Sequence, residues 1–132
     1  MKTELDKLRN GLIVSCQASI GWPLYGSEYM VQMAIAAKEG GAIAVRANEP
    51  TDIKAIKQAV DLPVIGVNKI YLKPPTVADV CITPTFKAAK EIIEAGCDIL
   101  AMDSTARGRG YKEVQVIVDE IKKTLSGYYT DG

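Results

Sequence analysis

Four short apolar segments, each followed by a polar or charged residue, constrain the fold of this chain most strongly. The clearest is segment 62–67, which is rich in β-branched residues and is followed by Asn68 and Lys69. Such a segment is typical of a strand that is buried on both faces of a parallel sheet. The other three segments follow the same pattern: 12–16 precedes Gln17, 42–45 precedes Arg46, and 99–102 precedes Asp103.

The C-terminal ends of parallel strands meet at one rim of the sheet, where loops converge and ligands bind. We therefore expect Gln17, Arg46, Lys69 and Asp103 to face a common pocket. A lysine at the end of a buried strand is partly desolvated, which lowers its pKa and makes a neutral amine available as a base. The alternative interpretation is that Lys69 is only the first solvated residue of a loop.

Helical patterns separate the apolar segments. Apolar residues recur at helical spacing after Ser27, and again within 53–60, 86–93 and 114–125. Ser27 and Thr83 have the chemistry of helix N-caps. A short helix over 2–9 and a short strand over 80–82, outside the main sheet, are also expected.

This alternation of strand and helix predicts a parallel sheet with right-handed crossovers. The chain has 132 residues, whereas an eight-unit barrel needs about 250, so about four β/α units fit. We predict a single α/β domain over 1–132 that resembles half of a TIM (β/α)8 barrel, with a tail that frays from about residue 126. An open flavodoxin-like sheet, which usually has about five strands, is the alternative.

Composition argues against several classes of function. Sixteen basic residues balance sixteen acidic ones, so net charge gives no support to nucleic-acid binding. Histidine is absent, which removes Ser-His-Asp catalysis and histidine-based zinc sites. The cysteines Cys16, Cys81 and Cys97 lack metal-ligand spacing and fit free thiols in a reducing compartment. With no apolar run of membrane-spanning length and a highly charged first segment, we expect a cytoplasmic protein.

A set of motifs runs in order through residues 11–107. Its members are GLIVSCQA from residue 11, AAKEGGA from 36, VRAN from 45, DIKAIK from 52, DLPVIG from 61, ITPT from 82 and AMDST from 101. Together these motifs resemble the N-acetylmannosamine-6-phosphate 2-epimerases of bacterial sialic acid breakdown, also described as N-acylglucosamine-6-phosphate 2-epimerases. The ordered set is far more specific than any single motif.

The resemblance implies a (β/α)8 barrel enzyme that interconverts N-acetylmannosamine 6-phosphate and N-acetylglucosamine 6-phosphate without a metal or redox cofactor. It implies that Lys69 moves the C2 proton and that Gln17 and Arg46 contact the substrate. The chemistry agrees, because a proton beside the aldehyde of an open-chain sugar needs a base and a group that stabilises the enolate. Two roles are open for Asp103: orienting Lys69 or Arg46 in the substrate site, or forming a structural salt bridge.

The chain also departs from the family pattern. Ile70 follows Lys69 where the family has an arginine, and Tyr25 stands where the family has a histidine. The family's acidic partner to the lysine and its phosphate-binding loop belong to a second half of the barrel, which we expect to be missing here.

Three functions therefore stay open from the sequence. The first is the epimerase activity, the second is a catalytically inactive remnant of that family, and the third is an aldolase that uses Lys69 as a Schiff-base lysine. The expected ligand is a small amino-sugar phosphate. A half barrel leaves its outer strands as open edges, so we also expect a homodimer that closes the sheet.

Overall fold

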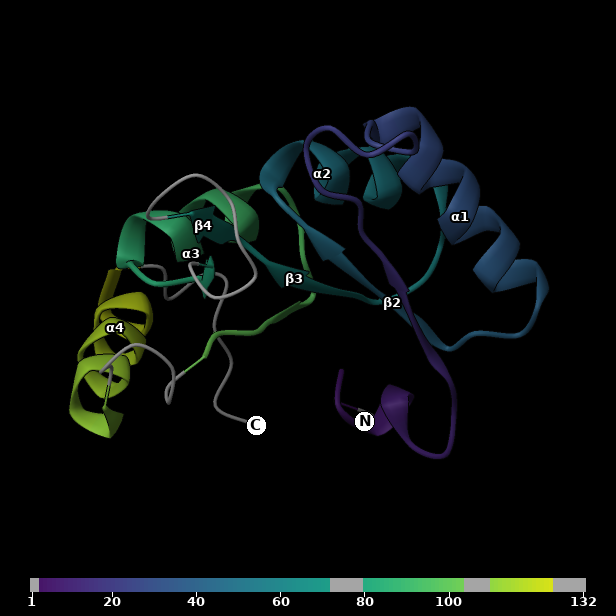
Figure 1. The fold of residues 1–132 in the computed structure, drawn as a ribbon. Coiled ribbons are helices and arrows are strands. Elements are labelled where there is room, and N and C mark those ends of the chain that lie inside the picture. Colours follow the sequence, from purple (N-terminus) through teal and green to yellow (C-terminus); the bar gives the residue numbers. More distant parts are fainter. Residues whose placement is uncertain (1–2, 72–79, 104–109, 125–132) are drawn as a thin grey trace.

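The chain forms a parallel four-stranded sheet with helices packed against it (Figure 1). The structure, a computed structural model, describes residues 3–71, 80–103 and 110–124. Across the sheet the strands follow the order β1 (Ile13–Cys16), β2 (Ala44–Asn48), β3 (Val64–Val67) and β6 (Ile99–Leu100). The helices are α1 (Ser27–Glu39), α2 (Pro50–Ala59), α3 (Phe86–Glu94) and α4 (Tyr111–Thr124), preceded by the 3-10 helix η1 (Asp6–Leu8).

A second, two-stranded antiparallel sheet lies beside the first. It pairs β4 (Lys69–Tyr71) with β5 (Val80–Ile82). The prediction of a short strand outside the main sheet is therefore confirmed, and its partner is the segment that carries Lys69. The tail expected to fray from about residue 126 lies outside the described residues.

The strand order identifies the architecture. The strands of the main sheet follow one another in chain order, as successive β/α units do in a TIM barrel. A flavodoxin-like sheet would instead place its first strand between the second and third. The α/β half-barrel prediction is confirmed. Figure 1 also shows α1 and α2 on the same side of β2 and β3.

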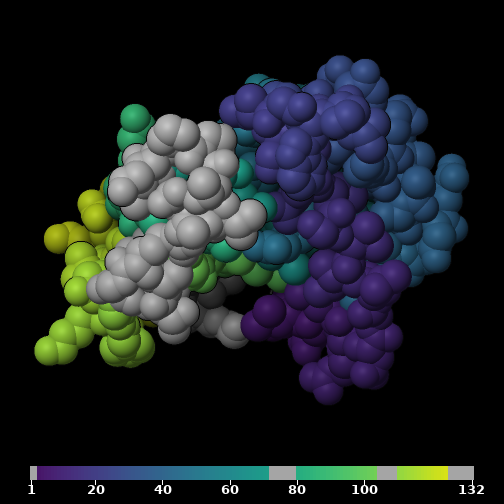
Figure 2. All heavy atoms as spheres, in the orientation of Figure 1, coloured from purple at the N-terminus to yellow at the C-terminus, as the bar shows by residue number. Residues whose placement is uncertain are grey.

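The register of the sheet separates a covered face from an open one. One row of paired residues, Val14, Val45 and Val64, packs in the core with Met30, Ile53 and Ile56 of the helices. The next row points to the opposite face and comprises Ser15, Arg46 and Ile65. In the space-filling view, the N-terminal segment and α1 occupy one side of the molecule and α4 the other (Figure 2).

Several predicted boundaries differ from the structure. Strand β2 continues to Asn48, so Arg46 lies within the strand and not after it. Ser27 is the first residue of α1 and does not cap it, since its hydroxyl donates to Asp52 Oδ1 at 2.6 Å. Thr83 is not the N-cap of α3, because that cap is Thr85, whose Oγ1 accepts from Ala88 N at 3.1 Å.

The hydroxyl of Thr83 instead links its own segment to the segments of Asn68 and Ala101. Thr83 is fully buried, with a left-handed φ of 49°. Its Oγ1 donates to Ala101 O at 2.7 Å and accepts from Asn68 N at 3.1 Å. Its own N–H donates to Asn68 O at 2.8 Å. A β-branched residue is strained at this φ, so these hydrogen bonds hold it there.

We expect Thr83→Val to destabilise the fold. Valine keeps the size and branching of threonine and therefore the backbone strain, but it leaves the Asn68 N–H and the Ala101 carbonyl without this partner. The loss should be about 1–3 kcal/mol of unfolding free energy, measured by urea denaturation. Thr83→Ser keeps the hydroxyl and is the matched control. Equal stability of the two variants would contradict this account of Thr83.

Candidate functional site

A cavity of about 200 Å³ lies where β1 and β2 end and β4 begins. Its polar lining includes Gln17, Arg46, Asn48 and Lys69, and its aromatic lining is Trp22 and Tyr71. Three of the four side chains singled out in the sequence thus share one cavity. No carboxylate is among the described residues that line it.

Lys69 and Arg46 form the electrostatic centre of this cavity. Burial lowers the pKa of the Lys69 amine from its ordinary value, and the positive charge of Arg46 lowers it further. Within the described part of the chain, no carboxylate pairs with either cation. The arrangement therefore makes it easier to remove a proton from the Lys69 amine, which lies beside a permanent positive charge.

Two asparagines fix the backbone that leads into Lys69. The Oδ1 atom of Asn48, at the end of β2, accepts from Lys69 N at 2.9 Å. Asn68 is buried, and its Nδ2 donates to Ala88 O and to Glu91 Oε2, both at 3.1 Å. The Lys69 side chain therefore extends from a backbone segment that is hydrogen-bonded to β2 and to α3.

Sequence reasoning missed this positioning role. Both asparagines were visible, one within the VRAN motif and one directly before Lys69. A polar residue at the end of an apolar strand is a weak signal of such a bond. The partner, however, lies about twenty residues away and cannot be identified from local pattern.

Gln17 brings an unsatisfied acceptor to the cavity. Its Nε2 donates to Ser15 Oγ at 2.9 Å, whereas its Oε1 is buried and has no hydrogen-bond partner among the residues that the structure describes. Buried polar atoms are normally bonded, at a cost of about 1–3 kcal/mol when they are not. The Oε1 atom is therefore suited to accept a hydrogen bond from a ligand.

Asp103 lies apart from this group. Its carboxylate Oδ2 accepts from Ile82 N and its own N–H donates to Ile82 O, both at 3.2 Å. It is not among the described residues that line the cavity. Asp103 instead ties the segment after β6 to the end of β5.

Hydrogen bonds also attach the β1–α1 connection to the start of α2. The Tyr25 hydroxyl donates to Glu49 Oε1 at 3.2 Å, and Ser27 bonds Asp52 as described above. Burial raises the pKa of both carboxyl groups, and the charge of Asp52 adds to the effect at Glu49. These contacts hold the loop that carries Trp22 over the strand ends.

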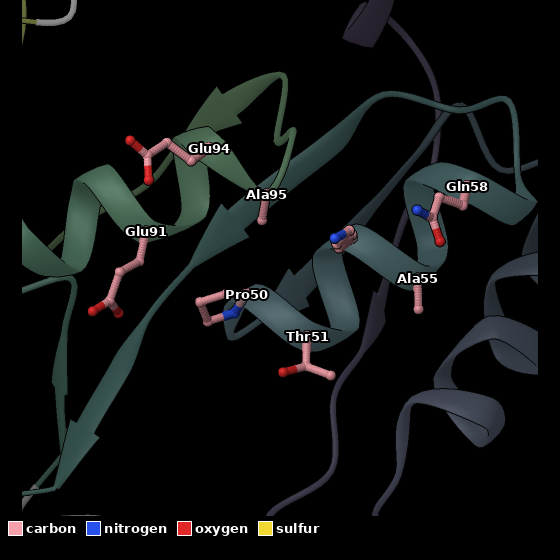
Figure 3. Close-up of a pocket in the computed structure, with 8 residues that line it drawn as sticks. Pro50, Thr51, Ala55, Gln58, Glu91, Glu94 and Ala95 are labelled. Atoms are coloured by element: carbon pink, nitrogen blue, oxygen red, sulfur yellow. The ribbon is translucent and has the colours of Figure 1, made fainter.

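A larger groove of about 420 Å³ lies between α2 and α3. Figure 3 shows Thr51 and Gln58 on one helix and Glu91 and Glu94 on the other. Its described lining comes from the helical layer, and the Glu91 carboxylate is already bonded to Asn68. Ligands of barrel folds bind at the strand ends, so the smaller cavity is the candidate site.

Comparison with known proteins yields a consistent set of relatives. Residues 30–131 match a family model described as putative N-acetylmannosamine-6-phosphate epimerase. A protein named putative N-acetylmannosamine-6-phosphate 2-epimerase from Listeria monocytogenes serotype 4b is 45% identical over 120 residues, which is 90% of this chain and 51% of that protein. One of the same name from Oceanobacillus iheyensis is 44% identical over 123 residues, covering 92% of this chain and 54% of that protein.

A solved structure agrees with these relatives. The N-acetylmannosamine-6-phosphate 2-epimerase from Clostridium perfringens superposes with a TM-score of 0.78 at 40% identity, over 92% of this chain and 52% of that one. The chain thus spans about half the length of the curated relatives it matches. On the extent of the family match and the agreement in fold, the chain belongs to the N-acetylmannosamine-6-phosphate 2-epimerase family.

Proposed function

We propose that this chain moves the C2 proton of an N-acylhexosamine 6-phosphate and so interconverts N-acetylmannosamine 6-phosphate and N-acetylglucosamine 6-phosphate. The observation that carries the proposal is the shared cavity of Lys69, Arg46 and Gln17, in which the pKa of the Lys69 amine is lowered. Membership of the family supports this reaction over others that use a lysine.

The proposed reaction needs no change of oxidation state. The neutral amine of Lys69 takes the C2 proton of the open-chain sugar, and the bonding electron pair moves toward the C1 oxygen. The Arg46 guanidinium stabilises the negative charge that develops on that oxygen. A water molecule then donates a proton to the opposite face of C2, and Lys69 releases the proton it took to solvent, so that the epimerisation is complete and the amine is neutral again.

Gln17 and Asp103 take different parts in this proposal. The unpartnered Oε1 atom of Gln17 supports a direct contact with substrate. The hydrogen bonds of Asp103 to Ile82 support a positioning role, in which it holds β5 against the segment after β6. Lys69 lies opposite Ile82 in the antiparallel pair, so the bonds between Asp103 and Ile82 hold the strand that pairs with the Lys69 backbone.

The two alternatives predict different chemistry. A Schiff-base aldolase would also use an amine of lowered pKa, and borohydride would then trap a covalent adduct with a carbonyl substrate. An inactive remnant would keep the fold but exchange no proton at C2. The described lining has no carboxylate to act as a second acid or base, so the remnant is the stronger competitor.

We expect the purified chain to incorporate deuterium at C2 of N-acetylglucosamine 6-phosphate in heavy water, followed by proton NMR. The rate should rise with pH and level off above the pKa of Lys69, because only the neutral amine is a base. Lys69→Met should lower the rate by at least about 100-fold, in line with the loss of a general base.

Lys54→Met is the control, since Lys54 is an exposed lysine on α2 outside the cavity. No exchange by the unmodified chain would favour the inactive remnant. Exchange that survives Lys69→Met would assign the base to another residue.

We further propose that the chain forms a homodimer through its open sheet edges. Strands β1 and β6 are the outer strands of the described sheet. Leu12 and Ile13, at the β1 edge, are 66% and 39% exposed. Exposed apolar edge strands readily pair with another chain.

Size-exclusion chromatography with light scattering should therefore report a dimer. Leu12→Lys places a charge at the proposed edge and should shift the equilibrium toward monomer. Val116→Lys is the matched control, because Val116 is a similarly exposed apolar residue on α4. A stable monomer of the unmodified chain would refute the dimer.

A further inference from the structure

We propose that Trp22 and Tyr71 form an aromatic subsite that receives the N-acyl group of the amino-sugar phosphate, and so set the preference for acylated substrates. This inference rests on the proposed function, because it assumes that C2 reacts at Lys69. The two aromatic residues lie in different segments, one in the β1–α1 connection and one in β4. Both line the cavity that holds Lys69.

Tyr71 is placed beside the reacting atom by the geometry of its strand. It is two residues from Lys69 in β4, and side chains at positions i and i+2 of a strand point to the same face. The N-acyl group is attached through its nitrogen to C2, the carbon whose proton Lys69 takes. A substrate with C2 at the amine therefore has its acyl group within reach of the neighbouring aromatic ring.

Trp22 offers a second apolar surface at the same cavity. Its side chain is 61% exposed, although tryptophan is usually well buried. Its backbone is held by two successive turns, in which Trp22 N donates to Ser19 O and Tyr25 N donates to Trp22 O, both at 3.0 Å. The Tyr25–Glu49 bond then anchors the turn to the next β/α unit. An exposed indole on an anchored loop is suited to ligand contact, not to core packing.

The remaining lining complements an acylated nitrogen. The Gln17 Oε1 atom lacks a hydrogen-bond partner and is suited to accept the amide N–H. A free amino sugar would instead bring an ammonium group toward the Arg46 guanidinium, and like charges repel. The aromatic rings would contact the methyl group, whose burial is favourable. The cavity thus combines an acceptor for the amide, apolar surface for the methyl and repulsion against the amine.

The test compares two neutral substituents at C2, so that charge repulsion does not contribute. Isothermal titration calorimetry would measure the affinity of the full chain for N-acetylglucosamine 6-phosphate and for glucose 6-phosphate. We expect a preference for the acylated ligand. Trp22→Ala and Tyr71→Ala should each reduce that preference about fourfold, the factor expected for one buried methyl group. Tyr111→Ala removes a highly exposed aromatic on α4 and should leave the preference unchanged.

Fluorescence gives an independent readout, because Trp22 is the only tryptophan of the chain. The acylated ligand should change its emission more than glucose 6-phosphate does. If Trp22→Ala weakened the binding of both ligands equally, the aromatic subsite would be overturned. Exchange at C2 by a chain that binds both ligands equally well would also overturn it. Failure of the unmodified chain to bind either ligand would overturn the proposed function, and the subsite with it.

Discussion

The partial burial of the Lys69 amine beside the Arg46 guanidinium is the constraint on which the rest of this account depends. Burial lowers the pKa of the amine most, and the positive charge of Arg46 lowers it further. Arginine keeps its proton in proteins, and no carboxylate lies among the described residues that line the cavity. Partly buried cations that serve only the structure are normally paired with a carboxylate. An unpaired amine beside a guanidinium is instead suited to proton transfer next to a developing negative charge.

The two cationic side chains come from different sheets of the fold. The parallel sheet carries Arg46 in β2, on the face opposite to the helices. The small antiparallel sheet carries Lys69 and is tied to the main sheet by side chain–backbone bonds from Asn48 and Thr83. Buried hydrogen bonds of this kind give modest net stability but are costly to break. These hydrogen bonds hold the backbone of Lys69 in place, and the backbone sets the direction in which the side chain leaves the strand.

Much of the architecture follows from the sequence, because the periods of the apolar residues are local signals. The polar residues that follow apolar segments of the sequence, Gln17 and Arg46, could be assigned to one site for the same reason, although Arg46 lies within β2 and not at its end. Asp103 shows where this reasoning stops: it also follows an apolar segment, yet its carboxylate accepts a hydrogen bond from the backbone of Ile82. The positions of Asn48 and Trp22 depend on partners in other β/α units, and no local pattern encodes them. Thr83 resembled a helix cap because its sequence context fits one, but tertiary hydrogen bonds held it in another conformation.

The most direct test of the central claim is the titration of Lys69 itself. Lysine amines labelled with 13C-methyl groups can be followed individually by NMR, with Lys69→Met assigning the signal. The account predicts that Lys69 titrates at a lower pH than an unperturbed lysine, whose pKa is about 10.4, and that Arg46→Met moves the pKa of Lys69 back toward that value. Titration of Lys69 together with the exposed lysines, in the presence of Arg46, would contradict it.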